Sequence, residues 1–193
     1  MYTKTFAKQV QHLQKKIREG TVYQFGDDKT YRFGNVDQMK SYLPTLVAPV
    51  THVHFWEELG FEVITDNRYK ADVVVVNNYL DETLDIKERI TEAWNKCKVG
   101  GYILFEVMSG ISQNNVNIQP NLFTRLQLAN ESMGITYFNM GDTKGQHSIS
   151  IDSSNTYGHS AMLDSLHKFP ECRELVTNVT VTKTANKELV CHR

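Results

Sequence analysis

Hydrophobic residues near the start of the chain recur at helical spacing, with Lys and Gln residues between them. The apolar positions of this stretch are Phe6, Val10, Leu13 and Ile17. The pattern predicts an amphipathic helix over residues 5–18 that ends near Gly20. Two short aromatic segments, VYQF and TYRF, follow on either side of GDDK and predict a β-hairpin.

From about residue 43, short apolar runs alternate with amphipathic segments. The predicted strands are LPTLVA, FEVITD, ADVVVVNN, YILFEVM, ITYFNMG and HSISID. The predicted helices are HVHFWEELG, LDIKERITEAWNKCKVGG, NLFTRLQLANESMG and SAMLDSLHKF, the second ending at Gly100-Gly101. The tail predicts two strands around a turn near Ala185-Asn186.

Alternating strands and helices predict an α/β fold with a mainly parallel, Rossmann-like sheet flanked by helices. The tail adds a C-terminal antiparallel hairpin. We assign residues 1–40 to an N-terminal appendage of helix and hairpin, and residues 41–193 to the main domain.

Composition narrows the classes of function. The formal net charge is −1, so the basic footprint that favours nucleic-acid binding is missing. Three widely spaced cysteines make a disulfide framework or thiolate zinc site a poor fit and favour a cytoplasmic location. His52 and His54 lack accompanying carboxylates at metal-ligand spacing, so no metal site is predicted. No apolar run reaches membrane-spanning length.

The segment KADVVVVNNYLDET combines a strongly apolar run with a polar ending. Four consecutive valines predict a strand buried on both faces. Asn77, Asn78 and Tyr79 come at its carboxyl end. Ligands of parallel sheets bind at such ends, so these three residues are candidates for a binding or catalytic site. The alternative is that the asparagines only cap the strand or form a turn.

The order of these segments resembles the class I S-adenosylmethionine-dependent methyltransferases, and most closely short phage- and plasmid-borne members. The resemblance rests on LGFEV, the acidic Asp66, ADVVVVNNYLDE and KVGGYILFEV, within residues 43–108. It implies S-adenosylmethionine as the cofactor and Asp66 as the ligand of its ribose hydroxyls. The alternative for Asp66 is a turn residue.

The resemblance further implies that Asn77 or Asn78 orients the methyl acceptor and that Tyr79 stacks on a planar ring. Glu106, in YILFEV, is a candidate acid–base residue, and the alternative is a solvent-facing strand residue. Catalysis of this kind depends mainly on positioning.

One motif of the family departs from its usual form. The glycine-rich cofactor loop, D/E-x-G-x-G, is expected after the first strand. If that strand is LPTLVA, the loop positions include Ala48 and Thr51 in place of glycines. These two residues are then the candidates for cofactor contact, and the loop is degenerate. Placing the loop at YRFGNVDQM supplies only Gly34.

Two functions follow from the same residues. The first is methyl transfer to a nitrogen or oxygen of an unidentified acceptor. The second is a catalytically inactive methyltransferase-fold protein of phage type that binds a host protein or a nucleotide-like ligand. A homo-oligomer is also considered, because the aromatic hairpin must pack against another surface. The location would be the host cytoplasm for a phage-encoded protein.

Overall fold

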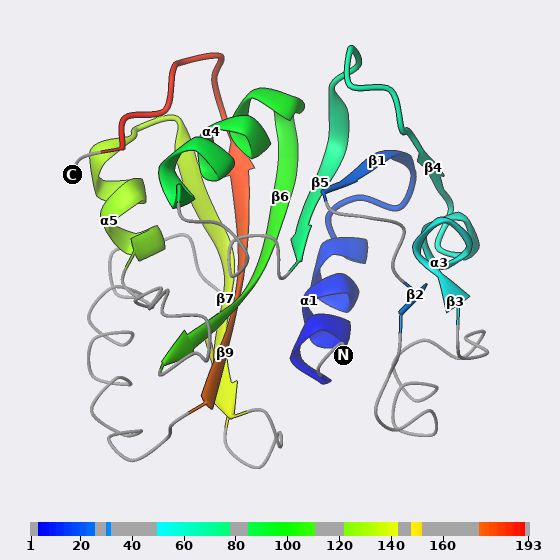
Figure 1. Ribbon diagram of the computed structural model, residues 1–193, viewed down its shortest axis with the longest axis horizontal. Helices are drawn as coiled ribbons and strands as arrows, with labels where there is room; N and C mark the ends of the chain where they lie inside the picture. Colours follow the sequence, from blue (N-terminus) through cyan, green and yellow to red (C-terminus); the bar gives the residue numbers. More distant parts are fainter. Residues whose placement is uncertain are drawn as a thin grey trace.

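The computed structural model describes residues 4–25, 30–31, 50–77, 85–110, 122–142, 148–151 and 174–191. Within these ranges seven strands form one sheet in the order β4-β1-β5-β6-β9-β7-β8 (Figure 1). Starting at the β4 edge of the sheet, the strands are β4 (Phe61–Val63), β1 (Gly20–Phe25), β5 (Ala71–Asn77), β6 (Cys97–Gly110), β9 (Glu174–Lys183), β7 (Met133–Asp142) and β8 (Ser148–Ile151).

The sheet is mixed. Strands β4, β1, β5 and β6 are parallel to one another, whereas β9 is antiparallel to both β6 and β7. The predicted Rossmann-like α/β fold is therefore confirmed, including antiparallel pairing at the C-terminal part of the chain. The predicted second strand of the tail is wrong, because residues 184–191 form no strand. They are instead tied to a helix: the Trp94 indole N–H donates to the Lys187 carbonyl at 2.8 Å.

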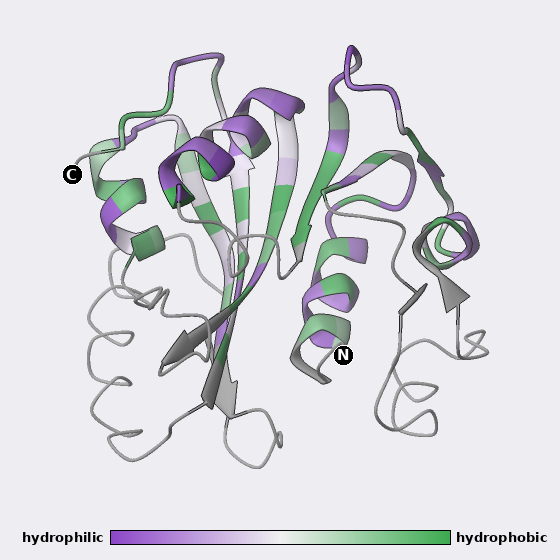
Figure 2. Cartoon of the chain, in the orientation of Figure 1, coloured by the Kyte–Doolittle hydropathy of each residue, from purple (hydrophilic) through white to green (hydrophobic). Residues whose placement is uncertain are grey.

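Helices cover both faces of the sheet. They are α1 (Lys4–Gln14), α3 (His52–Glu58), α4 (Ile86–Lys96) and α5 (Leu122–Ala129). α1 and α3 bury their apolar residues against one face, with Val73 and Val75 of β5. α4 and α5 pack on the other face, with Val74 and Val76. The valine run is therefore buried on both sides, as predicted, and gives β5 a hydrophobic band (Figure 2).

The aromatic hairpin prediction is wrong. β1, which contains VYQF, lies inside the main sheet between β4 and β5 and is parallel to both. After GDDK the chain contributes β2 (Thr30–Tyr31), which pairs with β3 (Val50–Thr51) in a separate two-stranded sheet. Only Val22 of β1 is fully buried. The mixed polar and aromatic sequence of β1 therefore resembles that of a surface strand, although β1 lies inside the sheet.

Helix α1 and strand β1 share a hydrophobic core with later parts of the chain. Phe6, Val10 and Leu13 of α1 are at most 1% exposed and pack with α3, β1 and β5. The predicted boundary at residue 40 lies outside the described residues and stays a prediction. The predicted strand LPTLVA and helix SAMLDSLHKF lie outside them as well.

The helix predicted to stop at Gly100-Gly101 ends earlier. α4 begins at an Asp85 cap, whose carboxylate accepts the Glu88 N–H at 2.9 Å, and ends at Lys96. Cys97 is already extended and starts β6. The Trp94 carbonyl at the helix end accepts the Cys97 N–H and also the ammonium group of Lys183, the latter at 2.9 Å.

Candidate functional site

The parallel part of the sheet contains a topological switch point. After β1 the chain forms β4 on one side of it and then returns to form β5 on its other side. Such a reversal opens a crevice outside the carboxyl ends of the two strands, where α/β proteins bind ligands. Here those ends are Phe25 and Asn77, and Phe25 is in register with Val76. Asn77 therefore stands at the switch point.

The structure describes only some of the other predicted site residues. Asn78, Tyr79 and Ala48 lie outside the described residues. Thr51 belongs to the small β2–β3 sheet, in register with Thr30, and not to a strand of the main sheet. LPTLVA itself lies outside the described residues; among those described, β1 is the strand before β5 at the switch point, and Gly26, Asp27 and Asp28 follow it in the sequence.

Polar residues form a row across the sheet at the level of Asn77. Asn77 is in register with Glu106 of β6, Glu106 with Asn178 of β9, and Asn178 with Asn139 of β7. Directly paired residues share a face of the sheet. The sequence stretches that hold these four residues are up to 101 positions apart (77 and 178), so no local motif announces the row.

Glu106 is buried and hydrogen-bonded. Its side chain is 3% exposed, and its Oε2 accepts the Asn178 Nδ2–H at 2.9 Å. The alternative considered from the sequence, a solvent-facing strand residue, is therefore wrong. A buried carboxyl group is a candidate functional group, because burying a charge is energetically expensive.

Helix α1 contributes to the same region. Gln9 is fully buried, and its Nε2 donates to the Val179 carbonyl at 2.9 Å and to Thr180 Oγ1 at 3.2 Å. Gln9 Oε1 accepts from Asn178 Nδ2 at 3.2 Å. His12, one turn further along α1, lies 5.2 Å from the Tyr137 ring, centroid to centroid.

We call this group the polar cluster. Its members are Gln9, His12, Glu106, Tyr137, Asn139, Asn178 and Thr180, each at most 6% exposed. Sequence reasoning missed all of them except Glu106. The available signal was the alternation of polar residues in TNVTVT of β9, which is normally typical of a solvent-facing strand.

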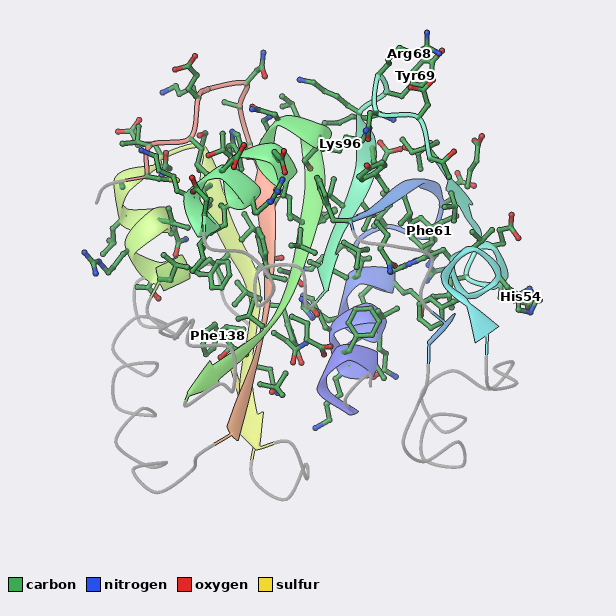
Figure 3. The ribbon with its side chains drawn as sticks, viewed as in Figure 1. His54, Phe61, Arg68, Tyr69, Lys96 and Phe138 are labelled. Atoms are coloured by element: carbon green, nitrogen blue, oxygen red, sulfur yellow. The ribbon has the colours of Figure 1, made fainter. Side chains whose placement is uncertain are left out.

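Asp66 lies away from the polar cluster. Its backbone carbonyl accepts from Lys96 at 2.9 Å, and Lys96 immediately precedes β6. Arg68, Tyr69 and Lys96 are found near the end of the sheet where β5 begins (Figure 3). Asp66 therefore lies near the amino end of β5, whereas Asn77 is at its carboxyl end.

The Asp66 carboxylate is bound within its own turn. It accepts the Arg68 backbone N–H at 2.8 Å and the guanidinium at 2.7 and 3.1 Å. The side-chain and backbone hydrogen bonds from Arg68 lower the pKa of Asp66. This geometry is that of an Asx turn. The ribose contact predicted for Asp66 would require Arg68 to release the carboxylate.

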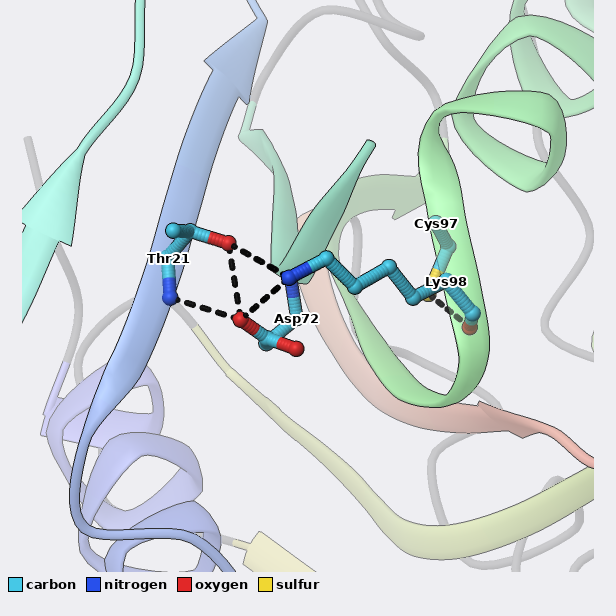
Figure 4. Close-up of polar contacts among 4 residues, drawn as sticks. All are labelled: Thr21, Asp72, Cys97 and Lys98. Atoms are coloured by element: carbon cyan, nitrogen blue, oxygen red, sulfur yellow. Dashed lines mark hydrogen bonds and ion pairs between the residues drawn. The ribbon is translucent and has the colours of Figure 1, made fainter. Parts of the chain in front are cut away.

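A second polar group ties three strands together at their amino ends (Figure 4). Asp72 Oδ2 accepts from the Thr21 N–H and hydroxyl, both at 2.8 Å, and from the Lys98 ammonium group at 2.9 Å. These residues come from β1, β5 and β6. Their position at the amino ends of the strands assigns them a structural role.

Nucleophile and metal chemistry find little support in the described part of the chain. Burial raises the pKa of the Cys97 thiol to about 12, so it stays protonated in the core. Within the described ranges, no group of three or more His, Cys, Asp or Glu residues is placed to hold a metal ion. None of the described helices is long and apolar enough to cross a membrane.

Comparison with known proteins shows distant similarity to methyltransferase structures. No protein-family profile matches the sequence, and no curated protein matches it. One similar structure is phosphoethanolamine N-methyltransferase 2 of Haemonchus contortus with S-adenosyl-L-methionine: TM-score 0.38, 12% identity, covering 100% of this chain and 40% of that one. This chain thus spans two fifths of that enzyme's length.

Two further structures are closer to this chain in length. The plantazolicin methyltransferase BpumL, in complex with a monoazolic desmethylPZN analogue and SAH, has a TM-score of 0.49 and 11% identity, covering 94% of this chain and 83% of that one. A Thermotoga maritima S-adenosylmethionine-dependent methyltransferase has a TM-score of 0.42 and 10% identity, covering 94% and 91%. Similarity at this level assigns no activity to this chain.

Proposed function

We propose that the protein binds S-adenosylmethionine at the carboxyl ends of β1 and β5 and transfers a methyl group to a nitrogen or oxygen acceptor. The observation that carries the proposal is the strand reversal at β1 and β5, which leaves Asn77 at the switch point. The sequence resemblance to class I methyltransferases, centred on the same strand, supports it.

The chain's residues fit such a cofactor in part. The parallel carboxyl ends of β1 and β5 suit a nucleoside, and Gly26 directly follows β1, where a close backbone approach is needed. Asp66 fits less well, because Arg68 holds its carboxylate. Its ribose contact remains a prediction. Asp27 and Asp28, which come directly after Gly26, are additional carboxylates to test for that contact.

When bound, S-adenosylmethionine supplies a methyl group on a positively charged sulfur. The chain's own residues would bind and orient the acceptor. We assign that task to Asn77 and Asn78, whose amides can both donate and accept, and ring stacking to Tyr79. In the sheet, Asn77 is in register with Glu106 of β6, and the preceding Val76 is in register with Phe25 of β1. Such positioning is the main contribution that a protein makes to methyl transfer.

Calorimetric titration with S-adenosylmethionine and S-adenosylhomocysteine tests the proposal. Saturable binding that is weakened by Asn77→Ala is expected. Two matched variants address Asp66: a ribose contact predicts weaker binding in Asp66→Ala and retained binding in Arg68→Ala. A turn role predicts retained binding in both. Absence of binding to either ligand by the folded wild-type protein would refute the proposed function.

The inactive alternative is favoured by one observation. The segment after β1 reads Gly26-Asp27-Asp28-Lys29, with one glycine where the family loop D/E-x-G-x-G has two. A protein that binds S-adenosylhomocysteine but transfers no methyl group to any offered acceptor would act through a host protein or a nucleotide-like ligand. The predicted homo-oligomer and cytoplasmic location also remain predictions.

A further inference from the structure

The side-chain amide of Gln9 has a fixed orientation. Its Nε2 lies 2.9 Å from the Val179 carbonyl oxygen and 3.4 Å from that of Phe105. Carbonyl oxygens only accept hydrogen bonds, so the NH₂ end of Gln9 must face the sheet. Its Oε1 then faces Asn178 and accepts from the Asn178 NH₂ group at 3.2 Å.

This orientation fixes the amide of Asn178 in turn. The two N–H groups of Asn178 are directed to Gln9 Oε1 and to Glu106 Oε2, at 3.2 and 2.9 Å. Reversing the Asn178 amide would turn its oxygen toward two other acceptors. The Asn178 Oδ1 atom therefore points elsewhere, and it has no hydrogen-bond partner although the residue is fully buried.

An unpaired buried amide oxygen requires an explanation, because leaving it unpaired is unfavourable. Here it belongs to the residue that binds the Glu106 carboxylate, so two hydrogen-bond acceptors lie together. An amino group, which brings several N–H donors and a positive charge, satisfies both. A phosphate or carboxylate would be repelled. The pair lies on the same register row as Asn77, which the proposed function assigns to the acceptor.

We propose that Glu106 and Asn178 bind the amino group of the methyl acceptor, which makes the substrate an amine; this rests on the proposed function. Glu106 pairs with the ammonium form and takes one of its protons. The N–H bond breaks, its electron pair stays on nitrogen, and the proton joins a carboxylate oxygen. The nitrogen is thereby left with the lone pair that a methyl acceptor needs.

Binding of small cations tests the proposal without enzyme turnover. Methylammonium, tetramethylammonium and potassium chlorides are compared at equal ionic strength by their effect on the thermal unfolding midpoint. Tetramethylammonium has the charge of methylammonium but no N–H donor. The wild-type midpoint is expected to rise more with methylammonium than with the other two salts. Equal shifts for all three salts, as expected if a water molecule alone occupies the site, would overturn the proposal.

Two variants locate the effect. Glu106→Gln keeps the shape of the side chain and removes the charge, and its amide oxygen can still accept from the Asn178 NH₂ group. It is expected to lose the extra methylammonium shift without a lower midpoint of its own. Glu131→Gln is the matched control, because Glu131 is 93% exposed and remote from the cluster in the fold, and it should keep the shift. A shift retained in Glu106→Gln would overturn the proposal.

A second measurement needs no variant. The side-chain amide NMR signals of Gln9 and Asn178 should move on titration with methylammonium and stay unchanged with tetramethylammonium. Unmoved signals overturn the proposal. Calorimetry with S-adenosylmethionine on the same samples separates the two claims. Cofactor binding without a methylammonium response refutes the amine site alone, whereas a methylammonium response without cofactor binding refutes the proposed function.

Discussion

Removing the Asp72 carboxylate should weaken the centre of the parallel sheet. Its Oδ2 accepts two hydrogen bonds from Thr21 of β1 and one from Lys98 of β6. The Asp72 backbone N–H also donates to the Thr21 hydroxyl at 3.1 Å. Substitution by alanine leaves the Thr21 N–H without its acceptor and Lys98 without its counter-ion.

The hydrogen bonds set the expected size of the effect. A hydrogen bond to a charged group contributes roughly 1.5–3 kcal/mol, and several bonds to one atom do not add fully. The Lys98 pair is partly exposed, at 43% and 28% for the two side chains, so it contributes at most about 1 kcal/mol. We expect Asp72→Ala to lower the free energy of unfolding by about 2–3 kcal/mol, and Asp72→Asn by about 1 kcal/mol, since the amide oxygen still accepts from Thr21.

Urea unfolding measures these changes. With a slope of roughly 2 kcal/mol/M, a loss of about 2 kcal/mol moves the midpoint by about 1 M. Lys98→Met is the companion variant. In a double-mutant cycle, Asp72→Asn and Lys98→Met should couple. Once either charge has been removed, removing the other no longer breaks an ion pair. Strict additivity of the two changes would show that the ion pair contributes nothing.

The pH dependence provides a sharper test. Burial would raise the pKa of Asp72, but the hydrogen bonds from Lys98 and Thr21 outweigh it, so the pKa lies below the ordinary 3.8. The contribution of the ionised carboxylate is therefore complete above about pH 5 and is lost as the pH falls through the lowered pKa. The stability difference between wild type and Asp72→Asn must shrink in acid. A difference that stays constant from neutral pH to well below 3.8 would refute the reasoning.

Three further predictions concern the start of β6 and the end of β9. A Cβ on Gly101 would lie 2.7 Å from the Asp72 carbonyl and 2.8 Å from Cys97 Sγ, so Gly101→Ala should destabilise the protein by about 1–3 kcal/mol in urea melts; an unchanged midpoint would contradict the packing. The Cys97 thiol, with its pKa raised to about 12, should resist iodoacetamide in the folded protein and react in urea, as peptide mass spectrometry can show; fast native labelling would disprove its burial. Burial, reinforced by the nearby charge of Lys70, lowers the pKa of Lys183 in the folded protein. Lys183 therefore stays protonated to a higher pH in the unfolded chain than in the folded one. The stability of wild type relative to Lys183→Met should accordingly rise with pH up to about 10.5, and a flat profile would exclude the shift.

The elements that the sequence predicted well have strong local signals. β5 follows from four valines, and α4 from its periodic apolar face. The sheet class follows from the alternation of such elements. β1 was misread because its pairing is non-local: Val22 is in register with Val63 and Val73, 41 and 51 positions away. No local pattern distinguishes such a strand from half of a hairpin.

The polar cluster was unpredictable for a related reason. Gln9 and Asn178 are polar residues on amphipathic elements, and each taken alone indicates a solvent-facing side. The fold places the polar positions of α1 and β9 against one another, so both are buried and satisfy each other in part. Polar patterning records that a side chain needs hydrogen bonds, but it does not record whether water or protein supplies them.

The position of β1 also changes the argument about the cofactor loop. With LPTLVA as the first strand, the loop would contain Ala48 and Thr51 and no glycine. With β1 in that place, the loop begins at Gly26 and continues with Asp27 and Asp28. Because Phe25 pairs with Val76, β1 ends beside Asn77, whereas Asp66 is held by Arg68 near the other end of β5. If the ribose needs a carboxylate, Asp27 and Asp28 are candidates because they closely follow β1 in the sequence. Weaker S-adenosylmethionine binding in Asp27→Asn or Asp28→Asn, with Asp66→Ala unaffected, would transfer the ribose contact to this segment.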